Sequence, residues 1–366
     1  MIIKRADIAL LAILAVVVLL VPATLGDYWV LTFGSVGAIA LAVIGLNVAM
    51  GWAGLLSFGQ PVFMAVGGYT SAILATRYSV NPWLALLCGI ALSAVVAAAV
   101  GFPVLKLESH YFAVATFAMS LIVLSVINGA QGFTGGAIGI IGIPPLTIGS
   151  VNFAEHLPYY VLVWVLVALA LLATYAIRAS RTGRAFRVLA ARPDVASSLG
   201  IGVRRYRVIA FVISAVLASL AGSLIVEFST YASPDNFNGD VGILVFAMLF
   251  IGGIRTASGP IIGAAIVTVV PVEATAIGKY SALTFELILL LILVVWPRGL
   301  GISLATGVED AIGRFAASLG KPRARGLGAR GLGARGLGAR GLEASVTSAG
   351  PDVTGASGSE GGRDRG

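Results

Sequence analysis

The side chains that could carry out chemistry are few, and they form no catalytic set. His110 and His156 are the only histidines in the 366 residues, and neither a Ser-His-Asp set nor a metal-ligand spacing accompanies them. No phosphate-binding loop of the form Gly-x-x-x-x-Gly-Lys-Ser/Thr occurs in the chain. We therefore expect no enzyme activity, no ATP hydrolysis by this chain itself, and no cofactor or metal ion.

Acidic and amide side chains inside apolar stretches are the remaining candidates. Glu227, Glu273 and Glu286 stand in or beside such stretches, where a carboxylate is costly and often functional. Positions near a membrane surface would lower that cost, so a structural role stays open for each of them. Asn47 and Asn128 are interpreted as groups that hydrogen-bond one helix to another.

The composition excludes an ordinary soluble protein. Hydrophobic residues make up 58% of the chain and charged residues only 11%, against roughly 25% charged in a typical soluble domain. The net charge of +8 indicates loops that face an anionic membrane surface rather than a nucleic acid. The only cysteine, Cys88, lies in an apolar run and is expected to be a small buried side chain.

Apolar runs that are long enough to cross a bilayer recur along the chain. They predict an all-α membrane protein, a polytopic bundle of about ten transmembrane helices. The first run follows Lys4 and Arg5 as in a signal peptide, but no small-x-small cleavage pattern follows it, so we interpret it as a helix. The expected spans lie at about 7–26, 29–50, 55–76, 82–103, 110–129, 158–178, 206–228, 240–254, 260–278 and 281–297.

The basic residues predict the orientation, because cytoplasmic loops are enriched in Lys and Arg. With ten spans, both termini and the arginine-rich loop 179–205 lie in the cytoplasm. Residues 1–302 then form one transmembrane domain. Residues 303–366 form a basic tail that repeats the unit RGLGA, and its glycine content and sparse apolar surface predict disorder.

One stretch departs from the composition of a plain membrane anchor. Residues 46–74 carry several glycines together with Ser57, Gln60 and Pro61, and the proline is expected to disfavour a straight helix. Irregular backbone at membrane depth survives only inside protein or beside a cavity, so we predict a discontinuous helix near 55–76, either lining a transport path or merely kinked and packed. The candidate path residues are Gly54, Ser57, Phe58, Gly59, Gln60, Tyr69 and Glu227.

The loop 179–205 contains a short amphipathic segment. Asp194 and the serines after it begin this segment, and Gly200 ends it. We expect it to bury Val195, Leu199 and Ile201 and to lie beneath the membrane. It is either a contact for a cytosolic protein or a plain anchoring loop.

Two loops on the opposite side are rich in turn residues and nearly free of charge, 129–157 and 229–239. They suit either a partner outside the cell or simple coverage of the helix ends. The candidate contact residues are Gly135, Gly136, Pro234 and Asp235.

Eight motifs together resemble the M-type membrane subunit of branched-chain amino-acid ABC importers. Their order and spacing carry the resemblance, which covers about residues 30–302. They are GWAGLLSFGQPVFMAVGGYTSA at 51–72, YFAVATFAMSLIV at 111–123, FTGGAIGIIGIP at 133–144, SRTGRAFRVLAARPDVASSLGI at 180–201, RYRVIAFVISAVLASLAGSL at 205–224, SPDNF at 233–237, IGGIRTASGPIIGA at 251–264 and WPRGL at 296–300.

The resemblance implies that residues 183–200 are a coupling helix that docks on an ATPase subunit. This chain departs from the family where Ala191, Arg192 and Pro193 replace an acidic pair, with one acid at Asp194. The departure weakens the expectation of a salt bridge from this loop to the ATPase, but it does not affect the expected docking. The residues expected to take part in coupling are Gly183, Arg184, Arg192, Asp194, Ala196, Leu199 and Gly200.

The resemblance also implies a function and an assembly. The chain is expected to be a permease in the cytoplasmic membrane of a bacterium or archaeon. Its expected partners are an H-type permease, two ATP-binding subunits that hydrolyse ATP, and a solute-binding protein that delivers branched-chain amino acids. Alternatives are import of urea, short amides or another small polar solute, an ion-gradient-driven transporter, and a membrane scaffold without transport.

Overall fold

The computed structural model describes residues 5–24, 26–106, 109–149, 151–274, 286–291 and 294. Most of the expected span at 281–297 and all of the expected tail at 303–366 lie outside these residues. Within the described part, Glu286 is exposed, whereas the side chain of Glu273 is outside it.

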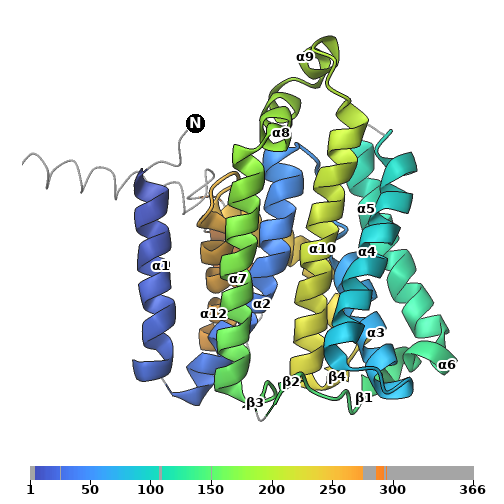
Figure 1. Cartoon of the computed structure of the whole chain (residues 1–366), viewed down its shortest axis with the longest axis vertical. Coiled ribbons are helices and arrows are strands. Elements are labelled where there is room, and N and C mark those ends of the chain that lie inside the picture. Colours follow the sequence, from blue (N-terminus) through green and yellow to red (C-terminus); the bar gives the residue numbers. More distant parts are fainter. Residues whose placement is uncertain are drawn as a thin grey trace, which may run out of the picture. The chain divides into compact units, whose positions relative to one another are not determined.

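Long apolar helices dominate the described chain (Figure 1). Strands are confined to short pairs at one end of the bundle. In chain order the helices are α1 (Arg5–Thr24), α2 (Asp27–Leu46), the π-helix η1 (Asn47–Trp52), α3 (Gln60–Arg77), α4 (Pro82–Val104), α5 (Ser109–Gly129), α6 (Gln131–Thr134), the 3-10 helix η2 (Gly136–Ile138), α7 (His156–Ala179), α8 (Arg181–Ala191), α9 (Pro193–Ser198), α10 (Val203–Ser229), the 3-10 helix η3 (Pro234–Phe237), α11 (Gly239–Gly252) and α12 (Gly259–Ala274).

Five stretches within the described residues are long and apolar enough to cross a bilayer: Asp27–Trp52, Pro82–Val104, His110–Gly129, His156–Ala179 and Val203–Ser229. Shorter apolar helices cover Leu10–Thr24, Gly239–Gly252 and Gly259–Pro271. The helical class is as predicted, whereas the number of about ten spans is not settled by these lengths.

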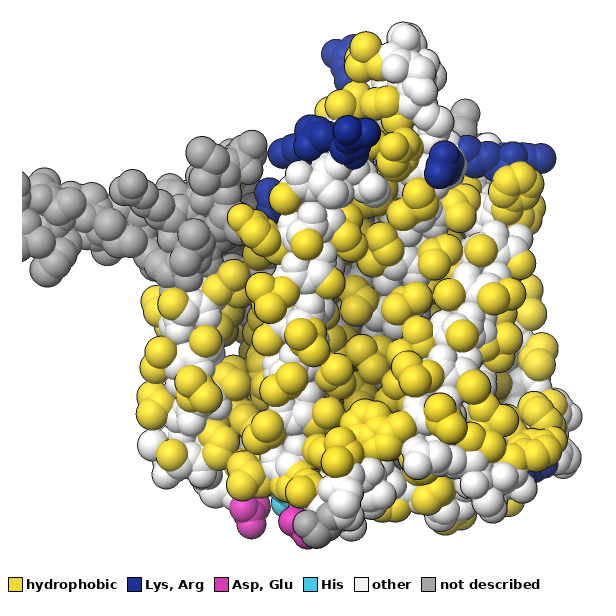
Figure 2. All heavy atoms as spheres, viewed as in Figure 1, with side chains coloured by type: hydrophobic (Ala, Val, Ile, Leu, Met, Phe, Trp, Pro, Cys, Tyr) yellow, Lys and Arg dark blue, Asp and Glu magenta, His cyan; other side chains and the backbone are white. Residues whose placement is uncertain are grey.

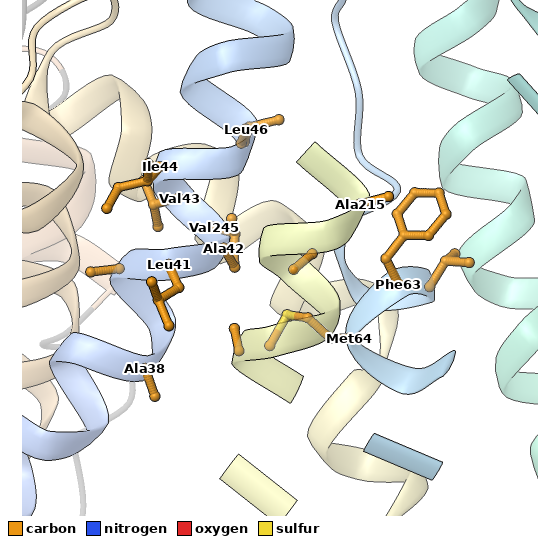
Figure 3. Packing of buried hydrophobic residues seen from close by; sticks show 14 of the residues in the cluster. Ala38, Leu41, Ala42, Val43, Ile44, Leu46, Phe63, Met64, Ala215 and Val245 are labelled. Carbon is orange, nitrogen blue, oxygen red and sulfur yellow. The ribbon is translucent and has the colours of Figure 1, made fainter. Parts of the chain in front are cut away.

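The core of the bundle lies where α10 packs against α2, α3 and α4. α2 in turn contacts α7 and α12. Figure 3 shows Leu41 and Ala42 of α2, Met64 of α3 and Ala215 of α10 among the buried side chains of this core. Small side chains such as those of Ala42 and Ala215 let the helix backbones lie close together beside these larger ones.

α3 and α10 approach each other closely. A Cβ added to Gly222 would lie 2.1 Å from the Met64 carbonyl oxygen, and one added to Gly67 would lie 2.5 Å from the Ser219 carbonyl oxygen. On its other side α3 meets α4, since a Cβ on Gly89 would lie 2.9 Å from the Gly67 carbonyl oxygen. These glycines are therefore needed for the helices to touch backbone to backbone.

The two ends of the bundle differ in charge. Figure 2 shows Lys and Arg side chains gathered at the end that carries α8 and α9, whereas Asp and Glu side chains appear at the opposite end. We call these the arginine-rich end and the loop end. Between them the visible surface is mostly hydrophobic. Leu87 of α4 and Val165 and Leu172 of α7 are each more than half exposed.

Short strands organise the loop end (Figure 1). The strand β1 (Ile140–Ile141) pairs antiparallel with β4 (Tyr231–Ala232), and β2 (Thr147–Ile148) pairs with β3 (Val151–Asn152). The β1–β4 pair joins the two turn-rich loops that the sequence singled out. The loops therefore form one surface.

Several sequence-based expectations are corrected. The helix expected at 55–76 begins only at Gln60, and Pro61 starts it rather than breaking it, because proline suits the first turn of a helix. The irregular segment is 53–59, which we call the break. Cys88 is exposed on α4 rather than buried. Asn128 is exposed, and Asn47 bonds to a loop rather than to another helix.

Candidate functional site

α8 is seated on the arginine-rich end by a buried apolar face. The Ser180 side chain caps the helix by accepting a 3.4 Å hydrogen bond from the backbone N–H of Gly183. Phe186 and Leu189 are buried, and the Phe186 ring meets Tyr206 of α10 edge-on, with 6.2 Å between ring centroids. α8 is therefore fixed to α10.

Gly183 allows α8 to lie against the end of α7. A Cβ at this position would lie 2.4 Å from the Arg178 carbonyl oxygen, so a larger residue would push the two helices apart. The arginines Arg181, Arg184 and Arg187 are exposed on the outer face of α8. These three arginines thus face outward from the bundle.

α9 begins after a kink at Arg192, whose backbone is extended with φ −152°. Pro193 supplies its first residue, where the missing N–H is harmless. The Ser197 and Ser198 hydroxyls donate to the Asp194 backbone carbonyl at 2.6 and 3.1 Å. Arg192 and Asp194 are both exposed, so neither charge is used inside the chain.

The end of α9 is closed by a Schellman motif. Gly200 has a left-handed backbone with φ +72°. Its N–H donates to the Ser197 carbonyl, and the N–H of Ile201 donates to the Ala196 carbonyl, each at 3.0 Å. Both bonds satisfy carbonyls that would otherwise lack partners at the helix end. The motif gives the tip of the loop a defined shape.

The expected burial is wrong for Val195 and Leu199, whereas Ile201 is partly buried against the core. Val195 is 45% exposed and Leu199 is 66% exposed, whereas Ala196 is fully buried. A helix of six residues has one face against the rest of the chain, and Ala196 occupies it. Val195 and Leu199 therefore face outward beyond the bundle. We call Val195, Leu199 and the Gly200 turn the tip.

The break runs from η1 at the arginine-rich end to the start of α3. Its backbone lies outside any helix, yet two of its N–H groups donate to side-chain hydroxyls. The N–H of Phe58 donates to the Thr116 hydroxyl of α5 at 3.0 Å, and that of Gly59 donates to the Ser57 hydroxyl at 3.2 Å. Such bonds allow irregular backbone to persist at membrane depth.

Most candidate path residues at the break are inside the bundle. Ser57 and Gln60 are each 2% exposed, and Gly59 is also buried. The Gln60 side-chain nitrogen donates to the Ser214 hydroxyl of α10 at 2.7 Å. Gly54 is exposed, with φ +71°. The structure thus brings these residues together but leaves mainly Gly54 and Phe58 within reach of a solute.

Tyr69 and Glu227 form a separate cluster near the loop end. The Ser71 hydroxyl donates to Glu227 Oε1, and Glu227 is 2% exposed. Among the residues that the structure describes, Glu227 Oε2 has no hydrogen-bond partner. Eleven residues of helix separate Ser71 from Gln60, roughly 16 Å. The Tyr69 hydroxyl lies 3.5 Å from the Ala232 carbonyl, so this cluster joins α3 to α10 and β4.

A row of aromatic rings beside the break was missed from the sequence. The Phe58 ring lies 6.3 Å from Phe117 of α5 and 4.5 Å from Phe246 of α11, and Phe246 lies 4.5 Å from Phe250, centroid to centroid. All four are partly exposed. We call them the aromatic row. The i, i+4 spacing of Phe246 and Phe250 was a visible signal, but their meeting with Phe58 was not.

The candidate residues of the outer loops lie in the joined loop surface. Gly135 has φ +80°, and a Cβ there would lie 2.0 Å from the Gly139 carbonyl oxygen, so glycine is required. Gly136 and Pro234 are buried, whereas Asp235 is exposed. Asp235 is thus the residue among these candidates whose side chain could meet a partner.

Known transport permeases are similar to this chain over most of its length. The family described as "Branched-chain amino acid transport system / permease component" matches residues 28–296. The permease protein LivM of Escherichia coli K12, of a high-affinity branched-chain amino acid transport system, is 29% identical over 70% of this chain and 66% of its own length. LivH of the same strain is 27% identical over 71% of this chain and 90% of its own length.

A more distant relative comes from an archaeon. The probable branched-chain amino acid transport permease protein LivH of Methanocaldococcus jannaschii is 26% identical over 63% of this chain and 74% of its own length. No solved structure matches. The chain spans slightly less than two thirds of the length of the LivM relative. The family match covers most of the chain, and its apolar helices identify a multi-pass membrane protein. The chain belongs to the family of branched-chain amino acid transport permease components.

Proposed function

We propose that the chain is the permease subunit of an ATP-driven importer that translocates branched-chain amino acids. In this proposal it pairs with an H-type permease and two ATP-binding subunits in the cytoplasmic membrane of a bacterium or archaeon. A solute-binding protein delivers the solute from outside. The observation that carries the proposal is the tip, which holds Val195 and Leu199 exposed beyond the bundle.

The charge of the two ends supports the orientation. Arginines surround α8 and α9, and basic residues favour the cytoplasmic side. The tip would then face the compartment that holds ATP. Both chain termini lie on the cytoplasmic side in this proposal, with the tail following the last span.

The tip is suited to carry a movement because it is both exposed and stiff. An apolar patch on a projecting surface is typical of a protein contact. The Schellman motif fixes its shape, and Phe186 and Leu189 fix α8 to the bundle. ATP binding can shift the transport equilibrium only through contacts that differ between its two states. A stiff tip on a seated helix provides such a contact.

The break and the aromatic row supply a candidate path. Irregular backbone at membrane depth is tolerated beside a cavity or against protein, and Phe58 lies both in the break and in the aromatic row. Partly exposed rings suit an aliphatic side chain better than urea or a short amide. The aromatic row therefore favours branched-chain amino acids, with those polar solutes as the alternative.

The loop surface is the proposed contact for the solute-binding protein. It stands at the opposite end from the tip, and the β1–β4 pair holds its two loops together. Asp235 is exposed on it. A basic group on the binding protein is the matching chemistry.

A pull-down from gently solubilised native membranes tests the function. The tagged chain should recover two ATP-binding subunits and a second permease, identified by mass spectrometry. The co-expressed binding protein, titrated with leucine, isoleucine, valine and urea, should bind the branched-chain amino acids. A homo-oligomer without an ATPase would contradict the proposal and direct attention to ion-gradient uptake.

A further inference from the structure

The π-helix η1 stands between α2 and the break. A π-helix is a rare widening of a helix that is frequent at functional positions. η1 covers Asn47–Trp52 and the break follows it at once. Any displacement of η1 therefore displaces the first residues of the break.

The loop between α11 and α12, residues 253–258, holds η1 at both of its ends. The Asn47 side-chain nitrogen donates to the Thr256 carbonyl at 2.8 Å, and its oxygen accepts from the N–H of Arg255 at 2.9 Å. Arg255 Nε donates to the Gly51 carbonyl at 2.8 Å. Asn47 is 3% exposed, so these bonds are protected from water.

The backbone of that loop is strained where it meets η1. Arg255 has φ +71°, a left-handed conformation that disfavours any side chain with a Cβ. Strain of this kind persists only where surrounding contacts enforce it. Here it presents both the N–H and the side chain of Arg255 to η1. Gly51 makes room for this arrangement, since a Cβ there would lie 2.4 Å from Asn47 Oδ1.

The proposed coupling region reaches the same segment from the other side. The Arg178 guanidinium, at the end of α7, lies 5.7 Å from the centre of the Trp52 ring. A Cβ on Gly54 would lie 3.4 Å from the Cα of Ala190 in α8. α8 thus touches the chain directly after η1, while the loop 253–258 grips η1 itself.

A ligand site is the alternative explanation for this polar cluster. The cleft beside it, lined by Asn47, Trp52, Thr174, Arg178 and Ala257 among others, holds about 20 Å³. That is room for about one water molecule. The cluster is therefore shaped for contacts within the chain rather than for a solute.

We propose that η1 and the loop 253–258 form a joint that passes movement of α8 and α9 to the break. Asn47 and Arg255 are its positioning residues. With the bonds in place, η1 is held on the loop 253–258, so movement of α8 against Gly54 has to bend the break. Without them, η1 can shift together with the break, and movement of α8 no longer changes the shape of the break. This inference rests on the proposed function, because it assumes that an ATPase moves α8.

The test uses the whole importer in proteoliposomes with its ATP-binding subunits and solute-binding protein. In Asn47→Leu, two buried hydrogen bonds are lost, and we expect uptake per ATP hydrolysed to fall about tenfold. ATPase assembly and ATP hydrolysis should persist, because the tip is untouched. Arg255→Lys keeps the charge but loses the Nε donor, and should give a smaller loss in the same direction. Thr32→Val is the matched control, since Thr32 is buried in α2 and, among the described residues, its hydroxyl bonds to the Tyr28 carbonyl alone.

A labelling experiment separates coupling from mere stability. In a Cys88→Ser background, Leu56→Cys places a thiol in the break. Its reaction rate with a thiol reagent should change when ATP is added, and Asn47→Leu should abolish that change. Unchanged uptake in both joint variants would overturn the inference, as would a parallel fall in uptake and hydrolysis. Failure of the parent chain to recover any ATPase would instead contradict the proposed function.

Discussion

We call the close contact between α3 and α10 at Gly67 and Gly222 the seam. The seam and the tip at α9 are held in opposite ways. At the seam, backbone meets backbone, and a Cβ on Gly222 would collide with Met64. At the tip, Ala196 alone is buried in α9, and Leu199 faces away from the bundle. The seam has no room for a change of side chain, whereas the tip leaves its apolar residues available.

The seam and the tip therefore serve different purposes. A close-packed seam transmits displacement because small gaps in packing are costly. An exposed tip with a fixed shape can bind a partner without first ordering itself, which lowers the entropic cost of binding. Substitutions at the seam should therefore act on folding, and substitutions at the tip should act on partnership.

The largest expected effect is at the seam. Gly222→Leu forces a side chain against the Met64 backbone and should destabilise the protein by about 3 kcal/mol or more. Thermal unfolding of the detergent-purified chain measures it. Gly26→Ala is the control, because nothing lies within 4 Å of a Cβ at Gly26. Equal unfolding temperatures for Gly222→Leu and the unsubstituted chain would show that α3 and α10 can move apart without loss of stability.

At the tip, Leu199→Asp should leave the unfolding midpoint unchanged because the side chain is already 66% exposed. It should weaken association with the ATP-binding subunits by about 2 kcal/mol, the scale of an interface hot spot. Titration of the ATPase onto the purified chain measures this. Leu199→Met keeps an apolar surface and should bind normally. A fall in stability without a change in ATPase binding would contradict this prediction, because Leu199 would then act on folding, as the seam does.

The Gly200 turn tests whether the shape of the tip matters for coupling. Gly200→Ala is expected to cost about 1 kcal/mol of local strain at φ +72°, although nothing lies within 4 Å of the new Cβ. Uptake should fall while ATP hydrolysis continues, and the loss should be larger in Gly200→Trp. Gly200→Asn should be milder, since asparagine tolerates this conformation. Normal uptake in Gly200→Trp would remove the turn from the coupling mechanism.

The smallest effect is expected where the break meets α5. Thr116→Val removes the acceptor for the Phe58 N–H and should cost about 1 kcal/mol. Faster hydrogen exchange of the Phe58 amide measures the loosened break. Thr76→Val is the control, because within the part of the chain that the structure describes its hydroxyl bonds to no group but the Ala72 carbonyl of the same helix. Equal protection of Phe58 in both variants would mean that the break is held by packing alone.

The α8–α9 loop and the break could both be located from the sequence, because their residue types are unusual for a plain membrane helix. The arginines and Gly200 identified the α8–α9 loop, and Ser57 and Gln60 identified the break. The side that each residue faces could not be predicted. Val195 and Leu199 were expected to be buried on the strength of their apolar character, but a helix of six residues has one contact face, and Ala196 fills it.

Long-range contacts are the second limit. The aromatic row brings together three segments, and no local pattern links Phe58 with Phe117 or Phe246. The joint likewise depends on Arg255 reaching Gly51 across most of the chain. Pro61 was interpreted as a helix breaker because its position relative to the helix start was unknown. Cys88 was placed inside because an apolar run does not reveal which face meets lipid.

The proposed function depends above all on docking of the tip on an ATP-binding subunit. A photo-crosslinking residue at Leu199, in native membranes, tests it most directly. Leu172 of α7 is the matched control, because it is 64% exposed on the apolar surface. We expect a crosslink from position 199 to an ATP-binding subunit and none from position 172. A crosslink from 199 to lipid alone, or the same partners from both positions, would contradict it.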